Sequence, residues 1–411
     1  MTFVERRPLE NVRYAMEYSL FALLLLLLLV LALAYANGTN DVSKAIATLV
    51  GSGVTNYRTA ILWGTVWTVA GAGLSALVAG AMLKTFSRGL VQPGIATPPA
   101  LALAILIGAI GWVLVASRTG LPVSTTHALT GALVGAGLVS IGSQGLAWPA
   151  IAGKIGLPLL LSPVLALSVS FIVHPMIRRI AARWEGACLC VIPASRALVT
   201  IDARGNTRTL LQTSALGQPM VAVPSQCDRA GLNGVTIGLD SIHWLSSGLA
   251  SLARGANDTP KIMAMLLLGS AVASWPSMTV QLGTLAAVAL AMGLGSYIGG
   301  LRVTEVLAEK VTRMDHVEGL SANLTTSSLV LVSATMGLPV STTHVSSSAI
   351  IGIGLLKGLK AVRWTTVRDM VLAWIVTLPV AGLFAGLTYV VLSQLPACRS
   401  CAITYFSRLF S

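Results

Sequence analysis

The octapeptide GLPVSTTH occupies residues 120–127 and returns unchanged at residues 337–344. A looser pair precedes it, with Gly-Thr-Asn-Asp at 38–41 and Gly-Ala-Asn-Asp at 255–258. Both motifs repeat at the same offset of 217 residues. Chance does not duplicate eight residues in this way, so the chain contains two copies of one structural unit, each with the same two polar clusters.

The composition places this doubled unit in a membrane. Of 411 residues, 55% are hydrophobic and 10% are charged, whereas a soluble domain carries about 25% charged residues. Residues 59–81 and 92–117 contain no charge, and about 20 apolar residues cross a hydrocarbon core. A soluble helix would show one apolar stripe instead. We therefore predict an all-α polytopic membrane protein, and its doubling is typical of transporters with a site between repeats.

The apolar runs predict the spans. Three of them, 42–51, 128–141 and 345–356, are too short to cross alone, which points to a site at mid-membrane. The Leu-rich first span has no cleavage site and is predicted to be retained. The predicted regions are 1–173 (repeat one), 174–235 (central loop), 236–395 (repeat two) and 396–411 (tail). The segments are 16–36, 42–51, 59–83, 97–116, 128–141 and 157–174, then 236–253, 260–274, 278–300, 319–336, 345–356 and 369–393.

The central loop carries much of the net charge of +13, with seven arginines between 174 and 235. By the positive-inside rule this loop is cytoplasmic, and the partner for the charge is an anionic lipid surface rather than nucleic acid. Two β-like runs, 197–202 and 207–211, predict a hairpin. Cys398 and Cys401 have metal-like spacing but no second pair, so we predict no metal site and no cofactor.

The octapeptide predicts an interrupted helix. Proline ends an incoming helix near Leu121, and Ser124 can cap a new one. The free N–H groups of that first turn attract anions, and the following hydroxyls add donors. Simple capping is the alternative for one copy, whereas two copies at equal offset favour a site for a tetrahedral oxyanion. The hydroxyl residues are Ser124, Thr125, Thr126, Ser341, Thr342 and Thr343.

The second cluster pairs an amide with a carboxylate: Asn40 with Asp41, and Asn257 with Asp258. A carboxylate inside a membrane is expensive and by default functional. Its oxygens suit a hard cation such as sodium, and a protonatable aspartate would serve proton coupling equally well. The alternative is that Asp41 merely caps the short helix that follows.

Each of the other polar residues near the motifs has two possible roles. Lys44 and Lys261 follow their aspartates by three residues, which suits a salt bridge or a contact with an anion. His127 and His344 close the octapeptides, and each suits either a proton relay or packing.

Arg118 and Arg254 are more simply explained by snorkelling than by an entrance. An enzyme built on Ser, His and Asp is not favoured, because no nucleophile elbow is present and a triad gives no reason for duplication.

These motifs carry a family resemblance. The paired Gly-x-Asn-Asp and GLPVSTTH sequences resemble the inorganic phosphate transporter (PiT) family over roughly residues 30–173 and 236–395. Residues 341–354 and 373–379 are similar to its bacterial low-affinity branch. The resemblance implies two inverted-topology repeats with re-entrant helical hairpins and broken helices. It also implies a central phosphate site and secondary transport driven by a cation gradient.

Carried over to this sequence, the resemblance makes the six octapeptide hydroxyls the phosphate ligands. It makes Asn40, Asp41, Asn257 and Asp258 the cation-coupling positions.

Three positions depart from the sodium-coupled pattern: Lys44 replaces an asparagine, and Thr68 and Asn323 stand where that pattern has glutamate. We therefore expect proton coupling, or partial replacement of a cation by Lys44, with sodium coupling as the alternative.

The predicted function is secondary transport of inorganic phosphate across the cell (inner) membrane. A sulfate or other oxyanion permease of the same fold is the first alternative, and a non-transporting phosphate sensor is the second. Metal–phosphate is a further candidate cargo, and a homodimer is left open. An acceptor such as Asp41 or Asp258 could select protonated phosphate against sulfate.

Overall fold

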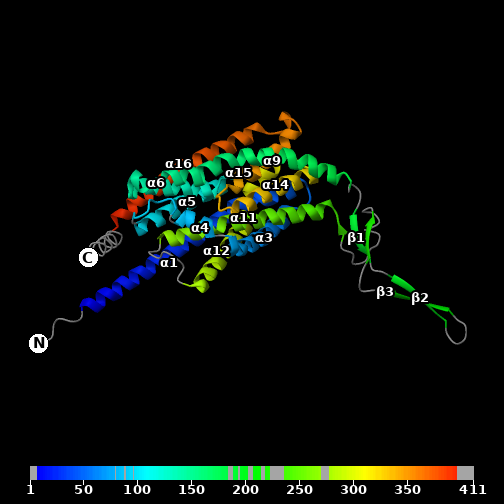
Figure 1. The fold of residues 1–411 in the computed structure, drawn as a ribbon, viewed down its shortest axis with the longest axis horizontal. Helices are drawn as coiled ribbons and strands as arrows, with labels where there is room; N and C mark the ends of the chain where they lie inside the picture. The colour runs from blue at the N-terminus through cyan, green and yellow to red at the C-terminus, as the bar shows by residue number, and fades with distance from the viewer. Residues whose placement is uncertain are drawn as a thin grey trace.

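The computed structural model describes residues 7–78, 80–87, 89–95, 97–183, 188–192, 195–201, 207–213, 218–222, 236–269 and 277–395. Within them, six helices are long and apolar enough to cross a membrane. The prediction of an all-α polytopic membrane protein is confirmed. Strands β1–β4 belong to the central loop and β5 follows it directly, and the β1–β3 region lies beyond one end of the helical body (Figure 1).

The first half contains the helices that carry the first copy of both motifs. A π-helical turn, Ile151–Gly156, precedes α9. The helices are α1 (Arg7–Asp41), α2 (Ser43–Gly51), α3 (Tyr57–Val78), α4 (Gly80–Ser87), α5 (Pro99–Thr119), α6 (Thr125–Ser140), α7 (Gly142–Gly145), α8 (Trp148–Ala150) and α9 (Leu157–Ala181).

The second half follows the same order. Shifted by 217 residues, α5 and α6 fall on α14 and α15 almost residue for residue. A 3₁₀ turn, Leu359–Ala361, precedes α16. The helices are α11 (Leu239–Gly269), α12 (Met278–Gly299), α13 (Leu301–Glu309), α14 (His316–Thr335), α15 (Thr342–Leu356) and α16 (Trp364–Gln394).

Several predicted boundaries differ from the structure, since α1 covers 7–41 rather than 16–36 and α9 continues to Ala181. The largest difference lies in the second half. We expected a break between segments 236–253 and 260–274, but α11 runs unbroken through Pro260. A proline inside a helix removes one backbone hydrogen bond. Buried membrane helices tolerate this when side chains and neighbours satisfy the backbone, and Pro260 is buried inside the protein.

The predicted hairpin of the central loop is confirmed. Strands β2 (Ser195–Ile201) and β3 (Thr207–Thr213) pair antiparallel, with Ile201 opposite Thr207. A separate sheet has the order β4-β1-β5, formed by β1 (Cys188–Ile192), β4 (Gln218–Ala222) and β5 (Thr236–Ile237).

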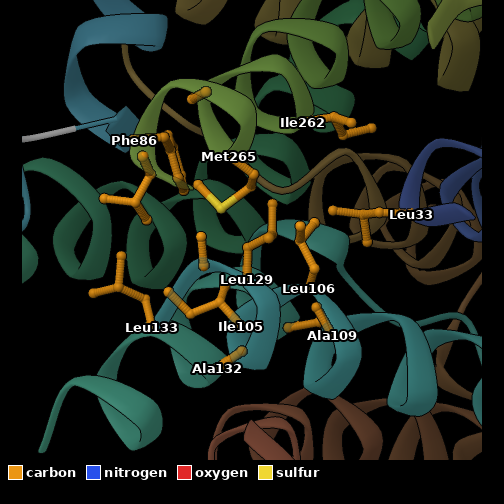
Figure 2. Close-up of a cluster of buried hydrophobic side chains, with 14 of the residues drawn as sticks. Leu33, Phe86, Ile105, Leu106, Ala109, Leu129, Ala132, Leu133, Ile262 and Met265 are labelled. Carbon is orange, nitrogen blue, oxygen red and sulfur yellow. The ribbon is translucent and has the colours of Figure 1, made fainter. Parts of the chain in front are cut away.

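The main apolar core joins the two halves. Side chains from α1, α4, α5 and α6 meet Ile262 and Met265 of α11 in one buried cluster (Figure 2). Helix α6 also lies against α16 backbone to backbone. A Cβ added to Gly135 would overlap the carbonyl oxygen of Gly382, so glycine is what permits this contact. The core thus positions the end of α1 and the start of α6.

Candidate functional site

The two octapeptides adopt the predicted helix starts. Gly120 ends α5 in the left-handed conformation (φ 77°), and Gly337 has φ 69° after α14. Only glycine takes this conformation at little cost. Ser124 then accepts from the N–H of His127 at 3.3 Å, and Ser341 accepts from His344 at 3.1 Å. The predicted N-caps of α6 and α15 are therefore confirmed.

The two helix starts meet inside the protein. Thr343 Oγ1 donates to the carbonyl of Val123 at 2.7 Å. Lys261 Nζ donates to Thr126 Oγ1 at 2.9 Å. Both contacts join one repeat to the other. All six octapeptide hydroxyl residues are buried, with exposures of at most 4%. The structure thus gathers at one buried place the hydroxyls that the sequence singled out.

The predicted salt bridges form in both repeats. Lys44 pairs with Asp41, and Lys261 Nζ lies 3.0 Å from Asp258 Oδ1. Each ammonium also reaches the carbonyl before its own octapeptide serine, at Val123 (2.9 Å) and at Val340 (3.2 Å). The lysines therefore fasten each carboxylate to the adjacent helix start.

The amides beside the aspartates differ between repeats. Asn40 Oδ1 accepts from Lys44 Nζ and from the N–H of Val123, both at 3.2 Å. Asn257 Nδ2 donates to Asp258 at 2.9 Å, and its Oδ1 has no partner among the described residues. Asp41 does not cap α2, whose N-cap position is Val42 without a side-chain bond. The capping alternative is therefore wrong.

Asn37 links the parts of the site, and sequence reasoning missed it. Its Nδ2 lies within hydrogen-bonding distance of Asp41 Oδ2 (2.9 Å), Thr125 Oγ1 (3.0 Å) and Asp258 Oδ2 (3.2 Å). Its Oδ1 accepts from Arg254 at 3.4 Å. The 217-residue offset was the available signal, because it pairs Asn37 with Arg254.

The arginines have different surroundings. Arg118 is exposed, as snorkelling would require. Arg254 is only 2% exposed and donates to Thr68 Oγ1 and Ser296 Oγ. Snorkelling is therefore wrong for Arg254, because a side chain held by polar neighbours inside the protein has no need to reach the membrane surface.

The octapeptide histidines form a pair behind the helix starts. The rings of His127 and His344 lie 4.5 Å apart, and His344 lies 4.2 Å from Trp374. His344 Nδ1 is 3.1 Å from the carbonyl of Leu159. Trp374 donates to the carbonyl of Pro122 at 3.3 Å. This arrangement favours packing, and a proton relay through the histidines stays a prediction.

Of the remaining predicted positions, Thr68 joins these contacts through Arg254, whereas Asn323 does not. Thr68 donates to its own helix at the carbonyl of Gly64, at 2.6 Å. Asn323 is buried, and neither of its amide atoms has a partner in the part of the chain that the structure describes. Cys398 and Cys401 lie outside the described residues.

Known proteins resemble this chain along most of its length. Residues 37–385 match the family model described as "Phosphate transporter family". A Pyrococcus abyssi protein that carries the name of a phosphate permease is 30% identical over 90% of this chain and 98% of its own. A Mycobacterium tuberculosis protein named "Probable low-affinity inorganic phosphate transporter" is 30% identical, over 91% of this chain and 78% of its own.

A solved structure titled "The sodium-dependent phosphate transporter" shares the fold. Its TM-score is 0.69 at 22% identity, and the match covers 91% of this chain and all of that one. The resemblance drawn from the octapeptides is confirmed, and so is the prediction that the chain is not an enzyme.

Proposed function

The chain belongs to the phosphate transporter family, and on that premise we propose that it is a secondary transporter of inorganic phosphate in the cytoplasmic membrane. One observation carries the proposal: two identical N-capped helix starts, one from each repeat, meet inside the protein, and all six of their hydroxyl residues are buried.

The chemistry of this site fits a tetrahedral oxyanion. The first turns of α6 and α15 have N–H groups without intrahelical partners, and helix N-termini attract anions. Thr126 already accepts a bond from Lys261. Its hydroxyl proton can therefore turn toward a substrate. We propose the six octapeptide residues as phosphate ligands, with Lys44 and Lys261 supplying positive potential.

The equal offset of both motifs supports two repeats around this site, and the family resemblance implies that their topologies are inverted. In such transporters, access alternates as one repeat moves against the other. Cross-repeat bonds such as Thr343 to Val123 would break or re-form in this movement. We place the central loop in the cytoplasm on the basis of its arginines.

For coupling we propose protons. Lys44 occupies oxygens of both Asp41 and Asn40 that a sodium ion would need. Thr68 and Asn323 contribute no carboxylate. The test is phosphate uptake by purified protein in liposomes, with sodium and proton gradients imposed separately. Uptake that follows the proton gradient supports the proposal. Uptake that follows sodium and ignores protons contradicts it and favours the sodium alternative.

The competing proposal for the substrate is sulfate, carried by a transporter of the same fold, because hydroxyls and helix N-termini suit either anion. Phosphate at neutral pH carries a proton that Asp41 or Asp258 could accept as a hydrogen bond. We expect excess sulfate to inhibit labelled phosphate uptake weakly and arsenate to inhibit it strongly. Equal inhibition by sulfate would favour the broader oxyanion permease. A protein that binds phosphate in liposomes without any flux would be a sensor.

A further inference from the structure

Arg254 is a buried cation that has no carboxylate partner in the described part of the chain. It lies on α11 one turn before Asp258, and the side chains of both residues are buried. Its guanidinium donates to three neutral oxygens, on Asn37, Thr68 and Ser296. Among the residues that the structure describes, it forms no salt bridge, and its Nε has no partner. A buried charge is expensive unless it is compensated, so this placement calls for an explanation.

The position is special in the repeat as well. Asn37 and Arg254 are equivalent residues of the two halves, and they bond to each other at the boundary between the halves. One half therefore supplies a neutral amide and the other a guanidinium. Through Asn37 the guanidinium adjoins both Asp41 and Asp258, because the same amide donates to both carboxylates.

The charges of the site do not cancel. Buried around Asn37 are the carboxylates Asp41 and Asp258, opposed by the cations Lys44, Lys261 and Arg254. Two negative and three positive groups leave one net positive charge before any ion or substrate binds. The lysines are each paired with an aspartate, so Arg254 carries the excess. Arginine stays charged at every physiological pH.

We propose that Arg254 is a resident cation: it permanently supplies the positive charge that a dissociable sodium ion would otherwise bring to the phosphate site. It acts on the substrate through Asn37 and the two carboxylates rather than by direct contact. This inference rests on the proposed function and deepens it, because it makes phosphate binding independent of sodium. The three oxygens that accept from Arg254 are also the ligand type that a hard cation prefers.

The rival explanation is that Arg254 only holds helices together, since it bonds from α11 to Thr68 on α3 and to Ser296 on α12. Three variants distinguish the effect of its charge from the effect of its hydrogen bonds. Arg254→Met removes the charge and the bonds. Arg254→Lys keeps the charge and loses the planar guanidinium with its several donors. Thr68→Val removes one bond and leaves the charge.

The experiment measures binding of labelled inorganic phosphate to purified protein, with sodium either present or replaced by N-methylglucamine. We expect the unmodified protein to bind phosphate equally in both buffers. Arg254→Met should lose about tenfold or more in affinity without sodium, a typical size for coupling between sites. Added sodium should restore much of the loss, because the vacated oxygens can hold it. Arg254→Lys should bind nearly as the unmodified protein does, in both buffers. Thr68→Val should lose much less affinity than Arg254→Met, and added sodium should not change that loss.

Three results would overturn the inference. They are a steep sodium requirement in the unmodified protein, unchanged binding by Arg254→Met without sodium, and equal losses in Arg254→Met and Thr68→Val. If Arg254→Met does not fold, as judged by size exclusion and melting temperature, the inference is still tested in two ways. These are the sodium independence of the unmodified protein and phosphate binding by Arg254→Lys and Thr68→Val. Failure of the proposed function looks different, because the unmodified protein would then bind no phosphate in either buffer.

Discussion

The hydroxyl of Thr343, in the second octapeptide, donates a 2.7 Å hydrogen bond to the carbonyl of Val123 in the first. The same carbonyl accepts from Lys44 at 2.9 Å. The backbone of one octapeptide is thus held by a side chain of its copy and by a lysine of its own repeat. Neither half of the site has its full set of contacts alone.

Thr343→Val should weaken phosphate binding modestly. The change keeps the shape and removes the donor, while Lys44 still satisfies the Val123 carbonyl. The loss should be about 1 kcal/mol, or about fivefold in an equilibrium constant. Labelled phosphate binding measures it. Thr335→Val is the matched control, since Thr335 bonds only to its own helix and is exposed. An equal loss in both variants would contradict the proposed role.

Ser124→Ala and Ser341→Ala should each reduce phosphate flux strongly and stability slightly. Loss of an N-cap costs about 1 kcal/mol. Ser277 caps α12 with the same geometry, accepting from Val280 at 3.2 Å, but is exposed. Ser277→Ala should therefore lower the melting temperature similarly and leave uptake unchanged. Uptake in liposomes and thermal unfolding in detergent make the comparison. If all three variants transport alike, the octapeptide serines are caps only.

Lys44→Met should destabilise more than the double variant Lys44→Met with Asp41→Asn. The single change leaves a buried carboxylate without its ion pair, which costs about 3–5 kcal/mol. The double change removes both charges, and the remaining Asn37 bond to position 41 suits an amide. Melting temperatures of the unmodified protein, both single variants and the double variant complete a cycle. Additive effects would show that the Lys44–Asp41 pair is not coupled.

Gly135→Ala should separate α6 from α16. An added Cβ would overlap the carbonyl oxygen of Gly382, and a backbone atom cannot rotate away. We expect a loss of about 1–3 kcal/mol, the usual cost of overpacking. Gly73→Ala on α3 is the control, because nothing lies within 4 Å of its added Cβ. That variant should be stabilised by a little under about 1 kcal/mol through helix propensity. Thermal unfolding tests both.

Local chemistry made much of the site predictable. Proline and serine in the octapeptide dictate where a helix ends and where the next one begins. Spacing of three residues dictates the Lys44–Asp41 bridge. The β2–β3 hairpin follows from β-branched runs around a turn. Each of these depends on residues close together in the chain, so the sequence is enough to show them.

Contacts between distant segments could not be predicted in this way. Asn37 matters because α1, α6 and α11 converge on its amide. Arg254 looks like an ordinary membrane-edge arginine until α3 and α12 are seen to surround it. The continuity of α11 through Pro260 likewise depends on its neighbours, since proline alone favours a break.

The close contact of α6 with α16 has a consequence for biosynthesis. Helix α6 carries the first octapeptide, and its glycine face rests on α16, the last helix among the described residues. Similarly, α15 rests on α9, with Gly352 against Ser170. While the ribosome is still making the second half, the first octapeptide has been inserted without the surface that supports it. The site can therefore be assembled only after translation reaches α16, and a truncated chain should be a target for quality-control proteolysis.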